Sequence, residues 1–576
     1  MTIVLTPYWS NGVQKLKMAP QPPPKPAHGL TPPMLDDEIH AQRCMAQLRS
    51  KDKDIEKYIY LSGLKEHDPH MFYRLCLAHM PEFTPIIYTP TVGQACQEYS
   101  KNYRRPEGLF VSIKDKGKIR SVLRAWPKLD DARISVVTDG SRILGLGDLG
   151  INGMPISIGK LSLYIAGAGI RPHSTIPICL DLGTNTQKYL DDPLYLGLRK
   201  KRVPTAEMTE FMDEFMYEMS QAFPKLLIQF EDFSTDHAFL YLERYRNQYP
   251  LFNDDIQGTG AVVLSGFINA ARLSSAASGR PLSSHRILFF GAGSAGVGVA
   301  MQLMSFFTLN GMSEQEARER IWLVDSQGLV YAGRGELAEH KESNVSLVRR
   351  VVFVFPIYPL LARFFLSLTL APHRLCPPGL RRPSDPGSAR RARVRQTHRA
   401  DGPVDVFRRV LARCNRGAQW PPSIPLPIIF PLSNPVKLSE CTFEEAVKYT
   451  DGKVLFASGS PFHEMEWKGK MLYPGQGNNM YIFPGLGLGA ILARCSSVTD
   501  SMVEASSLGL ANSLTPQEEA MGLLYPAIDR IREISAGIAM QVIRSAQDAG
   551  VDRHPELRAM SDSELLAFVN SKMWNP

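Results

Sequence analysis

The sequence predicts an α/β protein that includes a Rossmann-like dinucleotide-binding domain and has helical regions towards both ends. Two observations carry this prediction. Short β-rich runs alternate with helical stretches between Pro81 and Phe252, as in an α/β layer fold. Further along, the apolar run Arg286–Phe290 leads directly into a glycine-rich turn and a helical pattern, as at the start of a dinucleotide-binding unit.

Local patterns justify the elements in chain order. Leu35–Met80 has helical periodicity with few turn signals, which favours a small helical region. The strands and helices expected next are Ile134–Thr138, Ile176–Leu180, Met208–Ala222, Leu226–Phe230 and Asp236–Tyr245. Near the C-terminus, Thr515, Pro516 and Glu518 have the spacing of a helical capping box. We expect a packing helix at Leu523–Ala546 after it.

Net charge gives little support to a nucleic-acid partner. The 576 residues, enough for two to four domains, carry a formal charge of +8. Residues 342–426 contain fifteen Arg, no Lys and four acids, a local charge of +11, so the rest of the chain carries −3. Basicity therefore belongs to one segment, and steering of nucleic acid by the whole protein is not expected.

No secretory or membrane-spanning signal is evident, and support for a mitochondrial signal is weak because no Arg occurs before Arg43. The eight cysteines lack paired spacing, which favours a reducing compartment, and we expect the mitochondrial matrix or the cytoplasm. The apolar run Val351–Pro372 contains Arg363, Pro356 and Pro359. A membrane-spanning helix needs about 20 largely uninterrupted apolar residues, so we expect no membrane partner.

The glycine-rich turn has the residues that a dinucleotide needs. Gly291 permits a tight turn, Gly293 lets a pyrophosphate approach the backbone, and Gly296 lets helix and strand pack closely. The residues expected to bind the cofactor are Gly291, Gly293, Ser294, Ala295, Gly296 and Asp325. Asp325 ends a second apolar strand, Ile321–Val324, where a ribose-hydroxyl acceptor is usual. The alternative is a glycine-rich turn without a ligand.

Two pairs of acids follow apolar runs. Glu231 and Asp232 come after Leu226–Gln229, and Asp254 and Asp255 follow 23 residues later, after an intervening helix. Four carboxylates at adjacent strand ends repel one another unless a positive group neutralises them. Oxygen ligands favour Mg²⁺ or Mn²⁺, although solvated loop acids or helix caps would also explain one such pair.

Several longer motifs resemble those of malic enzymes. The resemblance runs from about Leu35 to Gln547 except for one internal segment. Its motifs are Phe83–Gly93, Thr138–Lys160, Asp181–Asn185, Phe230–Phe233, Phe252–Gly258, Pro427–Pro435, Phe456–Phe462 and Tyr473–Pro484. It implies four regions: a flexible arm at 1–34, a malic-enzyme catalytic domain at 35–256, an NAD(P)-binding domain at 257–545, and a C-terminal tail at 546–576.

The resemblance also implies roles for residues. Tyr88 would be the general acid and Lys160 the general base, while Glu231, Asp232 and Asp255 would hold the metal and Asp254 would support them. Arg142 would bind the malate carboxylate, and Asn434 and Asn479 would lie at the substrate and nicotinamide end, with Asn434 also touching the cofactor.

These roles imply oxidative decarboxylation of (S)-malate to pyruvate and CO₂, with NAD or NADP and with Mg²⁺ or Mn²⁺. The family also implies a homodimer or homotetramer. For the base, we expect neighbouring cations and burial to lower the pKa of Lys160 towards neutrality. Asp325 favours NAD, but Ser326 and Gln327 neither supply nor exclude a phosphate site, so both cofactors remain open.

One segment, at about 342–426, departs from the family and interrupts the NAD(P)-binding domain. Family members have a strand and a glycine turn here. Codons for Arg399–Leu411 can be chosen so that the second reading frame encodes Val-Leu-Met-Gly-Leu-Ser-Thr-Ser-Phe-Gly-Ala-Phe, which resembles that turn. We hypothesise that Ser346 to about Leu426 is retained intron followed by frame-shifted exon, and we expect this form to fold poorly and to have impaired activity.

Two other functions fit parts of the pattern. One is a catalytically dead relative that acts as a binding or oligomerising subunit. The other is a malolactic-type decarboxylase, which forms lactate without net cofactor reduction. Accumulation of reduced cofactor with malate and Mn²⁺ separates all three.

Overall fold

The computed structural model describes residues 36–127, 129–281, 284–325, 328–330, 426–433 and 439–576. The expected N-terminal arm, the apolar run Val351–Pro372, nearly all of the segment at about 342–426, and Asn434 lie outside the described residues. No helix among the described residues is long and apolar enough to cross a membrane.

The first described region is helical, as the periodicity of Leu35–Met80 predicts. Asp36 and Asp68 cap two of its helices by accepting hydrogen bonds from the backbone N–H groups of Ile39 and Met71. The helices are α1 (Asp37–Arg49), α2 (Asp54–His67), α3 (Pro69–Ala78), α4 (Met80–Ile87), α5 (Thr91–Gln97) and α6 (Tyr99–Asn102).

A five-stranded parallel sheet forms the centre of the second region, and its strand order is β1-β3-β2-β4-β5. The strands are β1 (Leu109–Ser112), β2 (Ile134–Thr138), β3 (Thr175–Asp181), β4 (Leu227–Phe230) and β5 (Leu251–Asn253). Their apolar runs bury both faces: Val136 belongs to one core cluster and Val137 to the other. The three strands expected here are confirmed.

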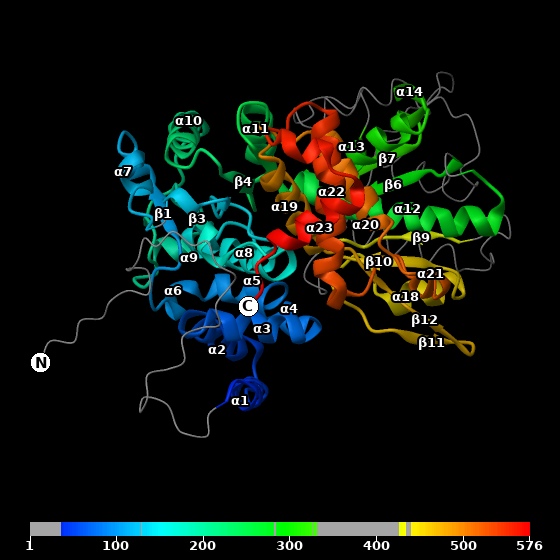
Figure 1. The fold of residues 1–576 in the computed structure, drawn as a ribbon, viewed down its shortest axis with the longest axis horizontal. Helices are drawn as coiled ribbons and strands as arrows, with labels where there is room; N and C mark the ends of the chain where they lie inside the picture. Colours follow the sequence, from blue (N-terminus) through cyan, green and yellow to red (C-terminus); the bar gives the residue numbers. More distant parts are fainter. Residues whose placement is uncertain (1–35, 128, 282–283, 326–327, 331–425, 434–438) are drawn as a thin grey trace, which may run out of the picture.

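Helices cover both faces of this sheet (Figure 1). The core under one face is shared with α7 and α10, and the core under the other face with α8. The helices of this region are α7 (Ile119–Leu123), α8 (Met154–Ala168), α9 (Gln187–Leu190), α10 (Thr205–Ala222) and α11 (Thr235–Tyr245). Short 3₁₀ turns are η1 (Ile113–Asp115), η2 (Leu129–Asp131), η3 (Gly150–Gly153) and η4 (Pro172–Ser174).

The dinucleotide-binding region begins with a π-helical turn and a long helix. Its first elements are η5 (Asp254–Gly258), α12 (Thr259–Ser278), β6 (Ile287–Phe290), α13 (Ser294–Leu309), α14 (Glu314–Arg318), β7 (Ile321–Asp325) and β8 (Gly328–Leu329). β6 pairs with β7 in parallel, and β8 is antiparallel to β7. The predicted succession of strand, glycine turn, helix and strand is therefore present.

A second group of strands follows in the described chain. β9 (Ile428–Ile429), β10 (Leu455–Ser458) and β13 (Gly475–Gln476) form a parallel sheet in the order β13-β10-β9. The α18 helix (Phe443–Thr450) packs on it, and β11 (Met465–Trp467) and β12 (Lys470–Leu472) form a hairpin. Among the described residues, β13-β10-β9 and β6-β7-β8 are separate sheets, and the β11–β12 hairpin is joined to neither.

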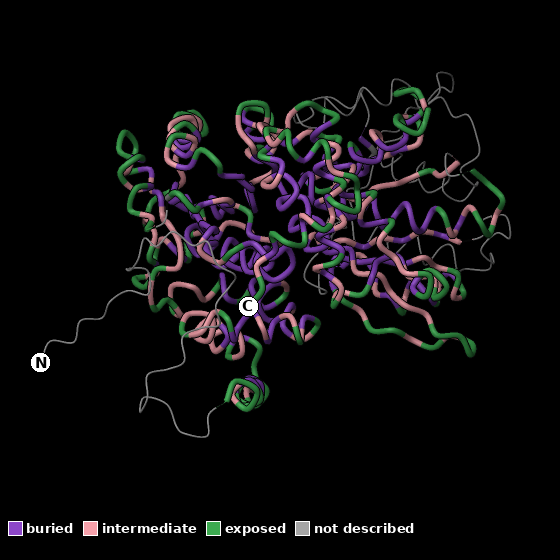
Figure 2. Tube along the Cα trace, viewed as in Figure 1, coloured by how far each residue is buried: buried purple, intermediate pink, exposed green. Residues whose placement is uncertain are grey.

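The C-terminal helices pack back onto both regions, and their inner faces are buried (Figure 2). They are η8 (Asn479–Tyr481), α19 (Phe483–Ala493), α20 (Asp500–Ala511), α21 (Pro516–Ala520), η9 (Ile528–Arg530), α22 (Ile531–Asp548), η10 (Pro555–Ala559) and α23 (Asp562–Lys572). The capping box is confirmed at α21. The expected helix begins at Ile531 rather than Leu523, because the chain turns at Gly522 with φ +75° and continues through Pro526.

Candidate active site

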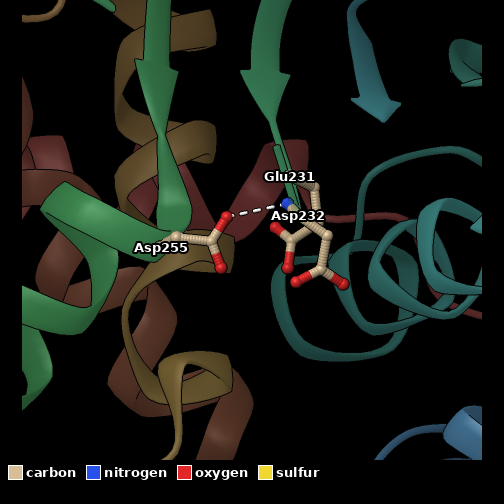
Figure 3. A group of neighbouring side chains, drawn as sticks. All are labelled: Glu231, Asp232 and Asp255. Carbon is tan, nitrogen blue, oxygen red and sulfur yellow. Dashed lines mark hydrogen bonds between the residues drawn. The ribbon is translucent and has the colours of Figure 1, made fainter. Parts of the chain in front are cut away.

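Two neighbouring strands bring the acidic pairs together. Glu231 and Asp232 follow β4, while Asp254 and Asp255 follow β5, which pairs with β4 in parallel. The carboxyl ends of parallel strands meet at one edge of the sheet, where ligand sites of such folds occur. Figure 3 shows the side chains of Glu231, Asp232 and Asp255 converging from these two strand ends.

These three carboxylates have the geometry of a cation site. One oxygen from each lies within 4.8 Å of the others. The Asp232 N–H donates to Asp255 Oδ2 at 2.7 Å, while the buried Asp232 Oδ2 has no hydrogen-bond partner among the described residues. Asp232 also has φ +55°, a strained backbone conformation typical of functional positions. An all-oxygen donor set with a free carboxylate oxygen fits Mg²⁺ or Mn²⁺.

The pKa values of these three carboxyl groups also favour a bound divalent cation. Burial raises the pKa of Glu231 well above its ordinary value, and the neighbouring acids raise it further, although Lys160 opposes the shift. Burial and Asp255 likewise raise the pKa of Asp232, and burial raises that of Asp255. The cluster therefore has more carboxyl groups than its neighbouring cations neutralise, and a divalent cation would supply the missing positive charge.

Lys160 lies in the middle of the acids. It projects from α8, its side chain is 1% exposed, and its Nζ lies 3.0 Å from Glu231 Oε1 and forms a short contact with Asp254 Oδ2. Burial lowers the pKa of Lys160, but attraction to Asp254 and Glu231 outweighs burial and raises it well above the ordinary value. The expectation that nearby cations lower this pKa was wrong, because the neighbours are carboxylates.

Tyr88 lies beside the lysine. It directly follows α4, is buried, and its ring centroid is 5.3 Å from Lys160 Nζ. Burial raises the pKa of the Tyr88 hydroxyl far above its ordinary value, against the opposing effect of Lys160. The structure thus brings the predicted acid and the predicted base together, and the tyrosine keeps its proton at neutral pH.

Arg142 contacts both the strand end that carries Asp232 and the first turn of α13. Its backbone N–H donates to the carbonyl oxygen of Asp232 at 3.1 Å. Its guanidinium donates to Thr235 Oγ1 and, at 3.2 Å, to Ser294 Oγ in the first turn of α13. The predicted substrate-binding arginine therefore lies between the carboxylate cluster and the start of the dinucleotide helix.

The glycine turn joins β6 to α13 as expected. Gly291 has φ +132°, and a side chain at Gly296 would place its Cβ 2.4 Å from the Gly291 carbonyl oxygen, so both positions require glycine. Gly293 precedes Ser294 and Ala295 at the start of α13, where free N–H groups suit a pyrophosphate. Asp325 ends β7, next in the sheet to β6.

Asn479 contacts the acidic residues around Lys160. Its Nδ2 donates to Asp254 Oδ2 at 2.8 Å and to Thr259 Oγ1 at 3.0 Å, so it supports the carboxylate that contacts Lys160. Asn434, the other predicted amide, lies outside the described residues.

Two buried residues near the site were missed by the sequence reasoning. The Tyr164 hydroxyl donates to Gln229 Oε1 at 2.6 Å, and Gln229 Nε2 donates to Glu231 Oε2 at 2.8 Å. These two hydrogen bonds fix Glu231 Oε2 and leave Oε1 for Lys160. The available signal was a glutamine inside an apolar strand, since a buried amide needs hydrogen-bond partners.

The fold and the site define a dinucleotide-binding α/β protein with a candidate metal and acid–base centre beside its glycine turn. Residues 65–246 match the family model described as malic enzyme, N-terminal domain, and residues 256–351 and 420–547 match malic enzyme, NAD binding domain. The chain belongs to the malic enzyme family.

Similar proteins agree with this assignment. The chain is 41% identical over 550 residues to an NADP-dependent malic enzyme of Dictyostelium discoideum, covering 95% of this chain and 93% of that protein. It is 38% identical over 552 residues to an NADP-dependent malic enzyme of Rattus norvegicus, covering 95% and 88%. The crystal structure of the Entamoeba histolytica malic enzyme has a TM-score of 0.51 at 21% identity and covers 94% of this chain and 89% of that chain, which shows a shared fold.

Proposed function

We propose that this protein catalyses the oxidative decarboxylation of (S)-malate to pyruvate and CO₂, with reduction of NADP⁺ and with Mg²⁺ or Mn²⁺. The observation that carries the proposal is the buried Lys160 ammonium, held between Glu231 and Asp254 and next to Tyr88. The names of the similar proteins support malic enzyme activity and the choice of NADP⁺.

Lys160 and Tyr88 are suited to opposite proton transfers. Lys160 takes the proton of the malate C2 hydroxyl as that carbon is oxidised, and for this it must be neutral. A cation bound to Glu231 would weaken part of the attraction that holds this proton, and burial already favours its loss. Tyr88, which keeps its proton, donates to C3 after CO₂ has left.

The bound groups supply the remaining chemistry: the dinucleotide accepts the hydride, and the divalent ion neutralises the carboxylates and stabilises negative charge on the C2 oxygen. Glu231, Asp232 and Asp255 would hold the ion. Arg142, whose guanidinium is at the border of both sites, would bind a malate carboxylate.

The test is an assay of the full chain with malate, Mn²⁺ and either NADP⁺ or NAD⁺. We expect malate-dependent reduction of NADP⁺ with equal amounts of pyruvate, above the background of Lys160→Ala. Lactate without reduced cofactor would instead identify malolactic activity. Neither product would indicate a catalytically dead subunit, and a preference for NAD⁺ would correct the choice of cofactor.

We further propose that the chain forms a homodimer or homotetramer in the mitochondrial matrix or the cytoplasm. The structure describes six cysteines, all of them buried, and Cys44, Cys76, Cys96, Cys179 and Cys495 are free thiols, which supports a reducing compartment. Light scattering of the purified protein tests the oligomeric state, and imaging of a tagged full chain tests the compartment.

A further inference from the structure

A loop between β2 and η3 lies against the candidate metal site. It runs from Asp139 to Asp148 and carries Arg142. The N–H of Arg142 donates to the Asp232 carbonyl oxygen, and the N–H of Leu144 donates to Asp232 Oδ1, both at 3.1 Å. The position of this loop therefore sets the positions of a predicted substrate-binding residue and a predicted metal ligand.

Arg202 holds both ends of the loop. It lies between β3 and α10, and its side chain is 8% exposed. At one end, its Nε and Nη2 donate to Asp148 Oδ2 and Oδ1 at 2.9 and 2.8 Å. At the other end, Nη2 donates to the Asp139 carbonyl oxygen at 2.8 Å and Nη1 to Asp139 Oδ2 at 3.4 Å.

Further hydrogen bonds connect this arrangement to the site. Asp139 Oδ1 accepts from the Ser141 N–H and hydroxyl, at 2.9 and 2.5 Å. Ser141 Oγ in turn accepts from the Ser234 N–H at 2.7 Å, two residues after Asp232. Asp148 Oδ2 also accepts from the Asn185 N–H at 2.7 Å, which gives the Asp181–Asn185 motif a structural role.

We propose that Arg202 is a positioning residue that holds both ends of the Asp139–Asp148 loop and thereby places Arg142 for malate and Asp232 for the divalent ion. Only a guanidinium has several nitrogens in one rigid plane, so it can bind a carboxylate with two of them and reach a second group at the same time. Lysine keeps the charge but lacks this geometry. The inference rests on the proposed function.

The test compares Arg202→Lys with wild type in the full chain. We expect the dissociation constant for Mn²⁺, measured by titration without substrate, to rise about tenfold or more, as is typical when a partner of a metal ligand is lost. The KM for malate should rise by a similar factor, while the dissociation constant for NADP⁺ stays within about twofold. Hydrogen exchange at the Arg142 and Leu144 amides should become faster.

Arg244→Lys is the matched control. Its guanidinium also binds a carboxylate through two nitrogens, at 2.7 Å each to Asp213, but this pair is exposed and holds neither end of the loop. We expect no change in any of the four measurements. If Arg202→Lys does not fold, Asp148→Asn replaces it, with the same pattern of effects and smaller size.

The proposal is overturned if Arg202→Lys lowers the unfolding temperature while Mn²⁺ and malate binding stay at wild-type values. It is also overturned if the affinities for Mn²⁺, malate and NADP⁺ all fall by one common factor, since that is the behaviour of a general structural residue. The Mn²⁺ titration and the exchange rates need no turnover. They therefore test Arg202 even if the wild-type chain fails to oxidise malate.

Discussion

At the scale of single residues, the surroundings of Lys160 oppose its proposed role. A general base must be neutral, but the neighbouring carboxylates raise the pKa of this lysine. Its ammonium is enclosed by Glu231 and Asp254, and the phenyl ring of Phe483 lies 4.6 Å from Nζ. The attraction that raises its pKa also makes it a competitor of the divalent ion for Glu231, which is both its neighbour and a predicted metal ligand. The base function and the metal site are therefore electrostatically linked.

The Lys160→Ala variant separates these two effects. We expect kcat to fall by about 10²- to 10⁴-fold, the usual contribution of a general base. The affinity for Mn²⁺ should stay the same or increase, because a competing cation has been removed. Steady-state kinetics and a Mn²⁺ titration measure the two quantities, with the exposed Lys470→Ala as a control. Weaker Mn²⁺ binding in Lys160→Ala would contradict this account.

The raised pKa values of Glu231, Asp232 and Asp255 predict a pH dependence of stability. A carboxyl whose pKa is raised by folding binds more protons when folded than when unfolded, so its contribution to stability falls as pH rises above the unfolded value of about 4. A divalent ion needs the deprotonated carboxylates. The gain in unfolding temperature from Mn²⁺ over EDTA should therefore grow between about pH 5 and 8. A gain that shrinks over this range would argue against the site.

The sequence could identify the residues of the site but not their electrostatics. Glu231 and Asp255 stand out because acids directly follow apolar strands. The neighbours of Lys160 are 71 and 94 residues away in the chain, so no local pattern shows that they are acids. Gln229 was missed for a similar reason, since its role depends on Tyr164 and Glu231 meeting it in three dimensions.

At the scale of elements, close packing of α13 on η5 places the dinucleotide turn beside the carboxylates. A Cβ at Gly298 would lie 2.5 Å from the Ile256 carbonyl oxygen, and one at Gly260 would lie 3.1 Å from the Gly298 carbonyl oxygen. The sequence predicts a role for the glycines of the turn itself, but not for Gly298, because the helix that it meets starts more than thirty residues earlier.

Gly298→Ala tests this packing. The added methyl group must push α13 away from η5, and we expect a loss of about 1–3 kcal/mol in the free energy of unfolding and weaker binding of NADP⁺. Gly537→Ala in α22 is the matched control, because no atom lies within 4 Å of its added Cβ. There alanine should stabilise the helix by up to about 1 kcal/mol. Urea unfolding measures the free energy of unfolding, and a titration measures NADP⁺ affinity. Equal effects of the two variants would refute the role of Gly298 in packing α13 on η5.

At the scale of the whole molecule, the sheet that carries the acidic cluster and the sheet that carries the glycine turn differ in how deeply their strands are buried. The four residues of β4 are all buried, whereas the four residues of β6 are only partly buried. Within the described part of the chain, β6 is an edge strand of its sheet and β9 is an edge strand of the other one. The match to the NAD binding domain also has a gap between residues 351 and 420. The strand pattern predicts β6 and β7, but residue patterns could not predict which neighbours these strands have.

The gap in this match favours the hypothesis that Ser346 to about Leu426 is retained intron followed by frame-shifted exon, in place of the strand and glycine turn of the family. We expect a chain with the family-like reading frame restored to have a higher unfolding temperature and at least tenfold tighter binding of NADP⁺, because a parallel strand is stable when both of its edges are paired. Hydrogen exchange at the Ile287–Phe290 amides should also slow. Sequencing of the transcript across Lys341–Pro427 is the first step. Equal kcat and equal NADP⁺ affinity in the restored and present chains would show that the segment does no harm.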